Sequence, residues 1–310
     1  MRFAIDILLA TYNGAAHLGE QIDSLLSQEF RDWRLLVRDD GSDDGTAELL
    51  ESYAARFIGK IRTLPNRGIR LGPSGNFSEL MLNSDAEYFM LCDQDDVWMP
   101  GKTGSTLEEM KKLESEYGRD KPLLVHTDFR VVDESLNVLA DSGWRYQKID
   151  PERNSLNRLL VQNVATGCTV MFNRALRNLA LPVPPDAVMH DWWLALVAGA
   201  FGGIGHLPEP LLLYRQHDVN AVGAKSWKLS SFMRQMRSRG DVRSALVKIQ
   251  RQAGVFLEKY DGVLTTEDRR MVRAFSRLAE KGFFEKRYSL LRYGFFHAGF
   301  LRKVGMFIFG

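Results

Sequence analysis

The chain has 310 residues, of which 45% are hydrophobic and 26% are charged, so it can bury a sizeable core and is not an intrinsically disordered protein. Its formal charge of +2 is unevenly distributed, because residues 223–310 hold 19 Lys and Arg against 7 Asp and Glu, a net of +12, which leaves −10 for residues 1–222. This balance excludes a uniformly basic nucleic-acid coat protein, and the acidic and basic parts need separate explanations.

Short apolar segments alternate with amphipathic ones along the first 126 residues. This βαβ rhythm predicts an α/β fold with a mainly parallel, doubly wound sheet, helices on both faces, and ligands bound beyond the carboxyl ends of the strands. The expected elements are strand 5–10, helix 18–26, strand 33–37, helix 46–57, strand 61–64, helix 74–82, strand 88–92, a helix after Pro100 and strand 123–126.

Beyond residue 128 the pattern is less regular. It predicts strands at 130–132, 169–172 and 211–214 and helices at 154–162 and 190–200. The longest uncharged run, 192–208, is shorter than the roughly 20 residues that span a bilayer, and its glycines indicate a buried helix followed by a turn. After Val222 the pattern is helical throughout, so we expect two domains, residues 1–222 and residues 223–310.

Compartment signals are few. Cys92 and Cys168 lie far apart with no CxxC spacing, which indicates a reducing compartment and argues against a disulfide framework or a structural zinc site. Asp6 interrupts the first apolar run and no small-residue cleavage site follows it, so we expect a strand there and no signal peptide.

Polar residues end three of the expected strands. The first strand runs into TYNG (residues 11–14), a turn that can offer backbone N–H groups to a ligand or simply cap the next helix. The second ends in RDDGSDDG (38–45), whose carboxylates repel one another and need a cation or a donor-rich partner. The fourth ends in CDQDD (92–96), whose oxygens suit a hard divalent cation; a solvated capping turn is the alternative. The dinucleotide fingerprint GxGxxG is absent from the RDDGSDDG turn, and the phosphate-loop pattern GxxxxGK[ST] is absent from the chain.

In this order and spacing, ATYNG (10–14), RDDGSDDGT (38–46) and DQDDVW (93–98) resemble the inverting family 2 glycosyltransferases, over about residues 3–222. The resemblance implies the nucleotide-sugar-binding A-type fold. Four later segments are similar to bacterial α-1,3-L-rhamnosyltransferases that build cell-wall or O-antigen polysaccharides, namely HTDFRVVDESLNVLADS, TGCTVMFN, MHDWWLAL and LYRQHDVNAVGA.

The resemblance implies a donor site at the first strand ends. Asp39 would bind the N–H edge of the nucleotide base. The other expected nucleotide-sugar contacts are Thr11, Tyr12, Asn13, Asp40, Asn76, Asp93 and Arg215. Many family members carry a basic residue just before the Asn of the third turn, where this chain has Gly75, so Arg67 or Arg70 would have to supply that contact from the preceding loop.

The resemblance also implies a metal and a base. Asp93, Asp95 and His217 would hold Mg²⁺ or Mn²⁺ on the donor diphosphate, with Asp96 supporting a ligand or capping the next helix. Asp191 would take the proton of the acceptor hydroxyl, although an Asp at a helix start is also a favourable cap. The adjacent pair Trp192 and Trp193 would either line the acceptor site or belong to the core.

Residues 223–310 interleave basic and aromatic side chains, which predicts contact with an anionic membrane surface. No nucleic-acid-binding module accompanies this charge, so nucleic acid is not an expected partner. The alternative is a helical subdomain that packs on the catalytic part or on a second subunit of a homodimer. The resemblance also implies an acceptor linked to a membrane lipid. The protein would then be cytoplasmic and peripheral at the inner face of the bacterial plasma membrane.

The resemblance implies transfer of L-rhamnose from dTDP-β-L-rhamnose to a lipid-linked saccharide. A UDP-hexose donor on the same fold is one alternative. A sugar nucleotidyltransferase is another, although its glycine- and lysine-bearing first loop is absent. The third is a non-catalytic scaffold protein whose Asp-rich turns are inert.

Overall fold

The computed structural model describes residues 3–216 and 239–296, and the chain divides into two compact units. The described part of the first unit consists of residues 3–143, 165–183 and 189–216. The second unit consists of residues 144–164, 184–188 and 239–296. Two internal segments therefore group with the C-terminal helices, whereas the sequence predicts a single boundary at Gly223.

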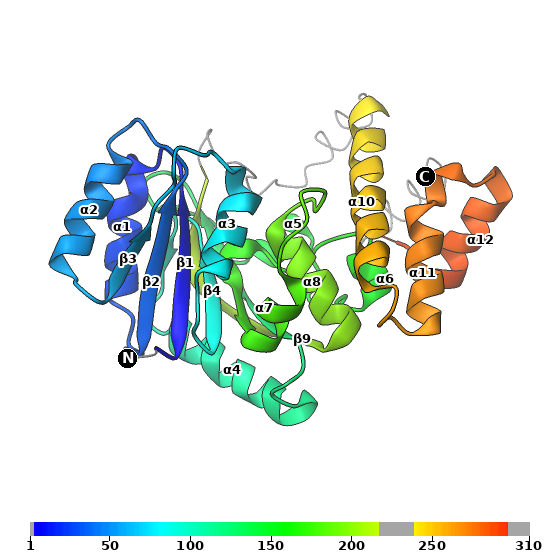
Figure 1. The fold of residues 1–310 in the computed structure, drawn as a ribbon, viewed down its shortest axis with the longest axis horizontal. Helices are drawn as coiled ribbons and strands as arrows, with labels where there is room; N and C mark the ends of the chain where they lie inside the picture. Colours follow the sequence, from blue (N-terminus) through cyan, green and yellow to red (C-terminus); the bar gives the residue numbers. More distant parts are fainter. Residues whose placement is uncertain (1–2, 217–238, 297–310) are drawn as a thin grey trace. The chain divides into compact units, whose positions relative to one another are not determined.

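The first unit is built on a nine-stranded mixed sheet with the order β3-β2-β1-β4-β8-β6-β9-β5, in which β7 also pairs with β6 (Figure 1). Six strands run in the same direction, and β5, β7 and β8 run against them. The predicted parallel-dominated α/β sheet is thereby confirmed. The strands are β1 (Ile5–Thr11), β2 (Trp33–Asp39), β3 (Ile61–Leu64), β4 (Tyr88–Cys92), β5 (Val97–Trp98), β6 (Leu123–Val132), β7 (Val138–Ala140), β8 (Val170–Asn173) and β9 (Gly203–Arg215).

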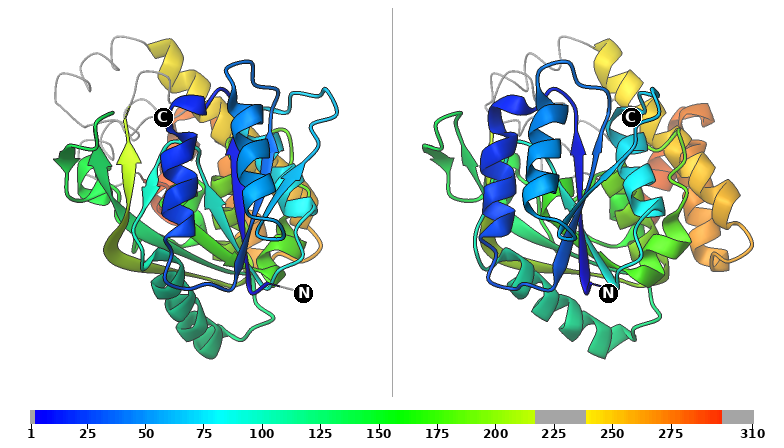
Figure 2. Two further views of the ribbon diagram at one scale, coloured as in Figure 1. Left: turned by 90° about the vertical axis from the view of Figure 1, so that its left-hand side faces the viewer. Right: turned by 60° about the vertical axis from the view of Figure 1, so that its left-hand side comes forward.

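Helices cover both faces of this sheet. Helices α1 and α2 lie over one face, while α3, α7 and α8 lie over the other (Figures 1 and 2). Strands β1 and β4 are almost wholly buried and apolar, as parallel strands covered on two sides must be. The helices of this unit are α1 (Ala15–Leu26), α2 (Thr46–Arg56), α3 (Gly72–Leu82), α4 (Lys102–Tyr117), α7 (Arg174–Ala180) and α8 (His190–Phe201), with a 3-10 turn at Gly167–Thr169.

The second half of the sheet differs from the prediction. Strand β6 is continuous and includes the expected strand 130–132, and β9 begins at Gly203, where a turn was expected after the helix. Strand β9 contains Gly203, Pro208 and Pro210. Because glycine and proline usually mark turns, the sequence pattern does not indicate a strand over the first part of β9. Proline lacks the N–H that a ladder needs, and the pairing of β6 with β9 shifts register after Thr127 and again after Asp128, opposite the Pro-containing segment.

The second unit is helical. Its helices are α5 (Gly143–Gln147, beginning at the last residue of the first unit's segment), α6 (Leu156–Leu159), α10 (Arg239–Tyr260), α11 (Thr266–Ser276) and α12 (Phe283–Tyr293), with a 3-10 turn at Leu278–Glu280. Helix α6 is much shorter than the expected helix 154–162. Two buried aromatic pairs lie in this unit: Phe256 with Tyr260 within α10, and Phe275 of α11 with Phe295, which follows α12. No helix among the described residues is long and apolar enough to cross a bilayer.

Gly202, in the first unit, lies too close to the backbone of another segment to carry a side chain. A Cβ on Gly202 would lie 1.9 Å from the carbonyl oxygen of Pro122, a backbone atom that cannot rotate away. We expect Gly202→Ala to lower the free energy of unfolding by about 3 kcal/mol, the upper end of the usual cost of overpacking, because the opposing atom is fixed. Gly205→Ala is the matched control, because its Cβ would meet Leu113 and Val125 at an ordinary 3.5 Å. Urea unfolding of the two full-length variants tests this, and equal stabilities would contradict it.

Candidate functional site

The carboxyl ends of β1 and β2 lie side by side at one edge of the sheet. In the parallel register Thr11 pairs with Asp39, and the Thr11 hydroxyl donates to Asp39 Oδ1 at 2.9 Å. Asp39 also accepts from the Ser42 hydroxyl and from the backbone N–H groups of Gly41 and Ser42, at 2.5, 3.1 and 2.8 Å. The donor-rich partner that this carboxylate needs is therefore the loop itself, which is held in a fixed shape.

Asp40 belongs to a buried polar network beneath that loop. Its carboxylate pairs with Arg38 at 2.7 Å and accepts the backbone N–H groups of Leu71 and Gly72 at the start of α3. Arg38 also donates to the Asn76 side chain at 3.0 Å, and Asn76 in turn donates to the Arg38 carbonyl. In this structure Asp40 and Asn76 order the β2 and β3 loops, and their predicted contact with a donor stays a prediction.

Tyr12 and Gln94 connect the β1 turn to the β4 turn. The Gln94 amide accepts from the Tyr12 backbone N–H at 2.8 Å and donates to the Tyr12 carbonyl at 3.0 Å. Gly14 permits this contact, because a Cβ there would lie 2.3 Å from the Gln94 side chain. The Tyr12 ring is partly exposed, and the Arg70 guanidinium stacks on it at 3.7 Å. Arg70 therefore lies at the β1 turn, and its contact with a donor stays a prediction.

Asn13 and Asp44 complete the loop assembly. Asn13 adopts a left-handed backbone with φ 48°, its N–H donates to the Ser42 hydroxyl, and its side chain accepts from Asp43 N–H. Asp44 accepts from the Thr46 hydroxyl and from Ala15 N–H. Burial opposes these hydrogen bonds, but their combined effect lowers the pKa of Asp44. The three strand-end turns therefore form one hydrogen-bonded surface.

Arg215, at the end of β9, holds the turn of residues 93–96 that follows β4, called the DQDD turn below. Its Nε donates to the Asp95 carbonyl at 2.9 Å, and its backbone N–H donates to Asp96 Oδ1 at 3.2 Å. The guanidinium also contacts the Glu20 carboxylate and the Glu134 carbonyl, and the side chain is buried. Arg215 thus fixes the backbone of the Asp-rich turn. A direct contact from Arg215 to a donor stays a prediction.

Three potential metal ligands gather behind this turn. Single ligand atoms of Asp93, Asp96 and Cys168 all lie within 4.8 Å of one another. Burial, followed by the charges of Asp95 and Asp191, raises the pKa of Asp93 to about 7. Burial and the neighbouring carboxylates Asp95 and Asp93 raise the pKa of Asp96 well above its usual range. Asp96 Oδ2 is buried and has no hydrogen-bond partner among the described residues, so this carboxyl group needs a proton or a nearby cation.

Lys102 supplies one buried cation next to this cluster, and the sequence analysis did not single it out. Its side chain is fully buried, and Nζ lies 4.3 Å from the centre of the Trp98 ring with no hydrogen-bond partner among the described residues. Burial lowers the pKa of Lys102 to about 8, against the opposing influence of Cys168, Cys92 and Asp96. A lysine in the first turn of a helix looks like an ordinary surface residue in sequence, so no pattern signals this role.

Asp191 lies in the first turn of α8 and is partly exposed. A Cβ on Gly167 would lie 3.7 Å from Asp191 Oδ2, and the charge of Asp191 contributes to the raised pKa of Asp93. Asp191 Oδ1 accepts the backbone N–H of Trp192 at 2.7 Å. The structure therefore brings the predicted base close to the Asp93 end of the DQDD turn, although the two are 98 positions apart in sequence.

Other residues around α8 have different roles from those of Asp191. Trp193 is fully buried and its indole N–H donates to the Ala180 carbonyl at 3.0 Å, so it is a core residue and not an acceptor contact. Trp192 is partly exposed, and its contact with an acceptor stays a prediction. His190 is buried and stacks on Phe77 with ring centroids 4.1 Å apart, and burial lowers its pKa to about 3. The proposed metal ligand His217 lies outside the described residues.

The sequence is similar to that of known glycosyltransferases. The protein-family model "Glycosyl transferase family 2" matches residues 6–179, which is more than half of the chain. A relative described as dTDP-rhamnosyl transferase RfbG, from Shigella flexneri, is 25% identical over 232 residues, covering 70% of this chain and 74% of the relative. Uncharacterized mycobacterial proteins are also 25% identical, and the match spans 59% of their length.

Solved structures share the fold at low sequence identity. Staphylococcus aureus TarS 1-349 in complex with UDP has a TM-score of 0.56 at 15% identity, over 94% of this chain and 80% of that one. The match to a longer TarS chain spans 43% of its length. The mannosyltransferase PcManGT from Pyrobaculum calidifontis, in complex with GDP-Man and Mn²⁺, has a TM-score of 0.55 at 15% identity, over 95% and 74%. These likenesses confirm the predicted A-type fold.

Proposed function

Because the chain belongs to glycosyl transferase family 2, we propose that it is a metal-dependent inverting glycosyltransferase that uses a nucleotide-sugar donor. One observation carries this proposal: Asp191 lies near the DQDD turn, close enough for its charge to raise the pKa of Asp93. A carboxylate that can accept a proton and a carboxylate-rich turn that can hold a cation are thereby combined at the carboxyl edge of a nucleotide-binding sheet.

In the proposed reaction Asp191 accepts the proton of the acceptor hydroxyl as that oxygen attacks the anomeric carbon of the donor sugar. The bond from this carbon to the diphosphate oxygen breaks on the opposite face, so the configuration inverts and the nucleoside diphosphate leaves with the bonding electron pair. Asp39, Thr11 and Tyr12 line the edge where the nucleotide would bind. Hydrogen bonds within the chain hold the loops around them, which lowers the entropic cost of binding.

The DQDD turn has the oxygen ligands that Mg²⁺ or Mn²⁺ prefers, and the unpartnered, buried Asp96 Oδ2 fits a site that needs a nearby positive charge. A divalent cation bound there would offset the negative charge that develops on the leaving diphosphate. We assign Asp93 and Asp95 as its ligands, with His217 as a third. Arg215 contributes by holding the Asp95 carbonyl and the Asp96 carboxylate in place.

We further propose dTDP-β-L-rhamnose as the donor and a lipid-linked saccharide as the acceptor. The later sequence segments and the dTDP-rhamnosyl transferase relative support the rhamnosyl donor. A UDP-hexose or GDP-hexose donor is the second candidate, supported by the UDP-GlcNAc complex of TarS and the GDP-Man complex of PcManGT. A membrane-borne acceptor would place the enzyme at the inner face of the bacterial plasma membrane, with residues 223–310 as the part that contacts lipid.

A donor-hydrolysis screen tests the proposal. The full-length protein is incubated with dTDP-rhamnose, UDP-glucose, UDP-GlcNAc and GDP-mannose, with Mg²⁺ or Mn²⁺ and with a chelator, and release of the nucleoside diphosphate is measured. We expect release from dTDP-rhamnose that the chelator abolishes. Preference for a UDP or GDP sugar would refute the rhamnosyl donor but would still agree with glycosyltransferase activity. No release from any nucleotide sugar would contradict that activity.

The raised pKa of Asp93 predicts a pH-dependent metal effect. In the metal-free protein this carboxyl group favours the folded state while protonated, so stability should fall as the pH rises from about 4 to about 7. A cation must displace the proton, so it binds more tightly above pH 7. We expect the increase in melting temperature caused by Mg²⁺ to be larger at about pH 8 than at about pH 6. A pH-independent shift, measured by calorimetry, would contradict this.

A further inference from the structure

Helix α12 is held firmly in the second unit by its inward face. Ser289 and Leu290 are buried on that face, and the helix ends at Gly294, which adopts a left-handed backbone with φ 67°. The next residue, Phe295, is fully buried against Phe275, with ring centroids 4.9 Å apart. The orientation of α12 within its unit is therefore determined by packing.

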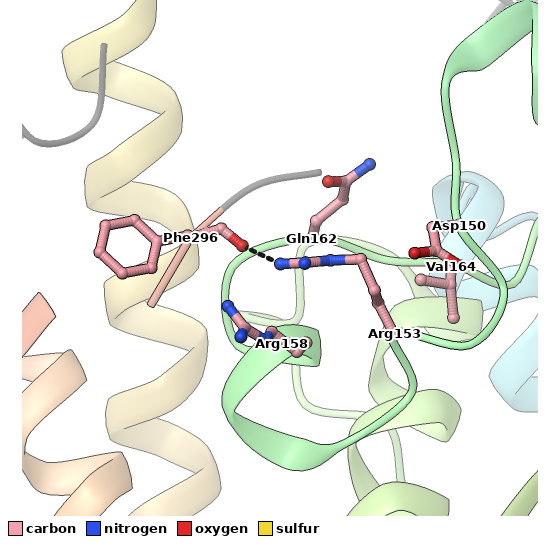
Figure 3. A pocket seen from close by; sticks show the side chains of 6 residues that line it. All are labelled: Asp150, Arg153, Arg158, Gln162, Val164 and Phe296. Atoms are coloured by element: carbon pink, nitrogen blue, oxygen red, sulfur yellow. Dashed lines mark hydrogen bonds between the residues drawn. The ribbon is translucent and has the colours of Figure 1, made fainter. Parts of the chain in front are cut away.

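The C-terminal carbonyls of α12 also have partners. Asn157 Nδ2 in α6 donates to the Tyr293 carbonyl at 2.8 Å, and the Arg158 guanidinium donates to the Gly294 carbonyl. In the preceding loop, Arg153 donates to the carbonyl of Phe296, across the small pocket shown in Figure 3. Since the last turn of a helix leaves carbonyls without partners of their own, these contacts fix the end of α12.

The outward face of α12 is apolar. Phe284 is 84% exposed, Tyr288 62% and Leu291 64%. Their spacing of four and then three residues puts them on one stripe, opposite Ser289 and Leu290. A helix on a protein surface normally turns polar residues outward, and a contiguous exposed apolar patch marks a surface that binds something.

Arginines border this stripe on both sides. The Arg287 guanidinium lies 3.4 Å from the centre of the Phe283 ring, and Arg292 donates to the Tyr288 hydroxyl at 3.2 Å. Glu285 is the one acidic residue of α12, against Lys286 and these two arginines. The outward face therefore combines an apolar centre with a cationic border.

We propose that the outward face of α12, defined by Phe284, Tyr288, Leu291, Arg287 and Arg292, docks on the surface of an anionic lipid bilayer. This inference rests on the proposed lipid-linked acceptor and names the element that would bring the enzyme to it. The stripe would enter the boundary between headgroups and acyl chains, while the arginines would bind lipid phosphates.

Charge complementarity favours a bilayer over other occupants of this face. A second copy of the chain packed on the same stripe would bring together two helices that each carry Lys286, Arg287 and Arg292 against Glu285 alone, so positive charges would mostly face positive charges. The chain's own residues 297–310 contain Arg302 and Lys303 and no Asp or Glu, so they also offer no counter-charge. Anionic headgroups supply one at every position along the helix.

Vesicle sedimentation of the full-length protein tests the proposal, with vesicles made of equal parts of phosphatidylglycerol and phosphatidylcholine. We expect Phe284→Glu and Leu291→Glu each to weaken binding by about tenfold or more, since each replaces an apolar side chain that the bilayer would bury with a negative charge. Val263→Glu, at a 65% exposed position between α10 and α11, adds the same charge off the stripe and should change binding by less than about threefold.

Equal binding of the stripe variants and the wild type would overturn the proposal, and so would an equal loss in Val263→Glu. A stripe variant that turns a dimer into a monomer in light scattering, with vesicle binding unchanged, would identify a subunit interface instead. Nucleoside diphosphate release from the donor is measured on the same samples. Its absence together with stripe-dependent vesicle binding would refute the enzymatic proposal and still support the lipid surface.

Discussion

Replacing Asp191 by Asn is expected to reduce sugar transfer, and donor hydrolysis with water as the acceptor, by about 100-fold to 10,000-fold, the range that a positioned general base contributes. The amide is isosteric and cannot take the proton of the attacking hydroxyl. Asp191 accepts the backbone N–H of Trp192, and an Asn oxygen can keep this hydrogen bond, so the start of α8 should be unchanged. Calorimetry with the nucleoside diphosphate should give an affinity close to that of the wild type.

Asp43→Asn is the control for this substitution. Asp43 is an exposed carboxylate of the loop after β2, so its removal changes the net charge near the site by the same amount. We expect it to keep nearly full activity. If Asp191→Asn retains activity like the control, Asp191 is only a helix-capping residue, and another group must act as the base.

The strand ends were predictable because the signal is local and repeated. Strands β3 and β4 have the predicted bounds. Strands β1 and β2 begin where the apolar runs indicated and extend slightly further, to Thr11 and Asp39, which the parallel register places side by side. Parallel strands end at the same edge of the sheet, so the topology alone brings the Asp-rich turns that follow them together. This part of the site depends only on the alternation of strands and helices.

The supporting contacts were not predictable, because they join positions far apart in sequence. Gln94 lies between two aspartates, and only the folded chain shows that it binds the Tyr12 backbone. The sequence predicts that Arg215 contacts the donor, and only the fold shows that Arg215 also donates to the Asp95 carbonyl from the end of β9. The extent of β9 itself was hidden by glycine and proline inside a strand.

Replacing Asp95 by Ala is expected to abolish the metal dependence of donor binding and to lower donor turnover by about 100-fold or more, since the cation would lose a carboxylate ligand that orients it on the diphosphate. Arg215 donates to the backbone carbonyl of Asp95, which alanine also has, so the turn should keep its shape in this variant. Calorimetry with the nucleoside diphosphate, with and without Mn²⁺, measures the loss.

Cys168→Ser is the comparison that identifies the ligand set. Cys168 is the third member of the Asp93 and Asp96 cluster, but burial raises the pKa of its thiol well above the usual range, so it stays protonated at neutral pH. A thiol is a poor ligand for Mg²⁺ or Mn²⁺, which prefer oxygen. We therefore expect Cys168→Ser to keep metal-dependent binding within about threefold of the wild type. Loss in Cys168→Ser with retention in Asp95→Ala would move the cation site from the Asp95 side of the turn to the buried side.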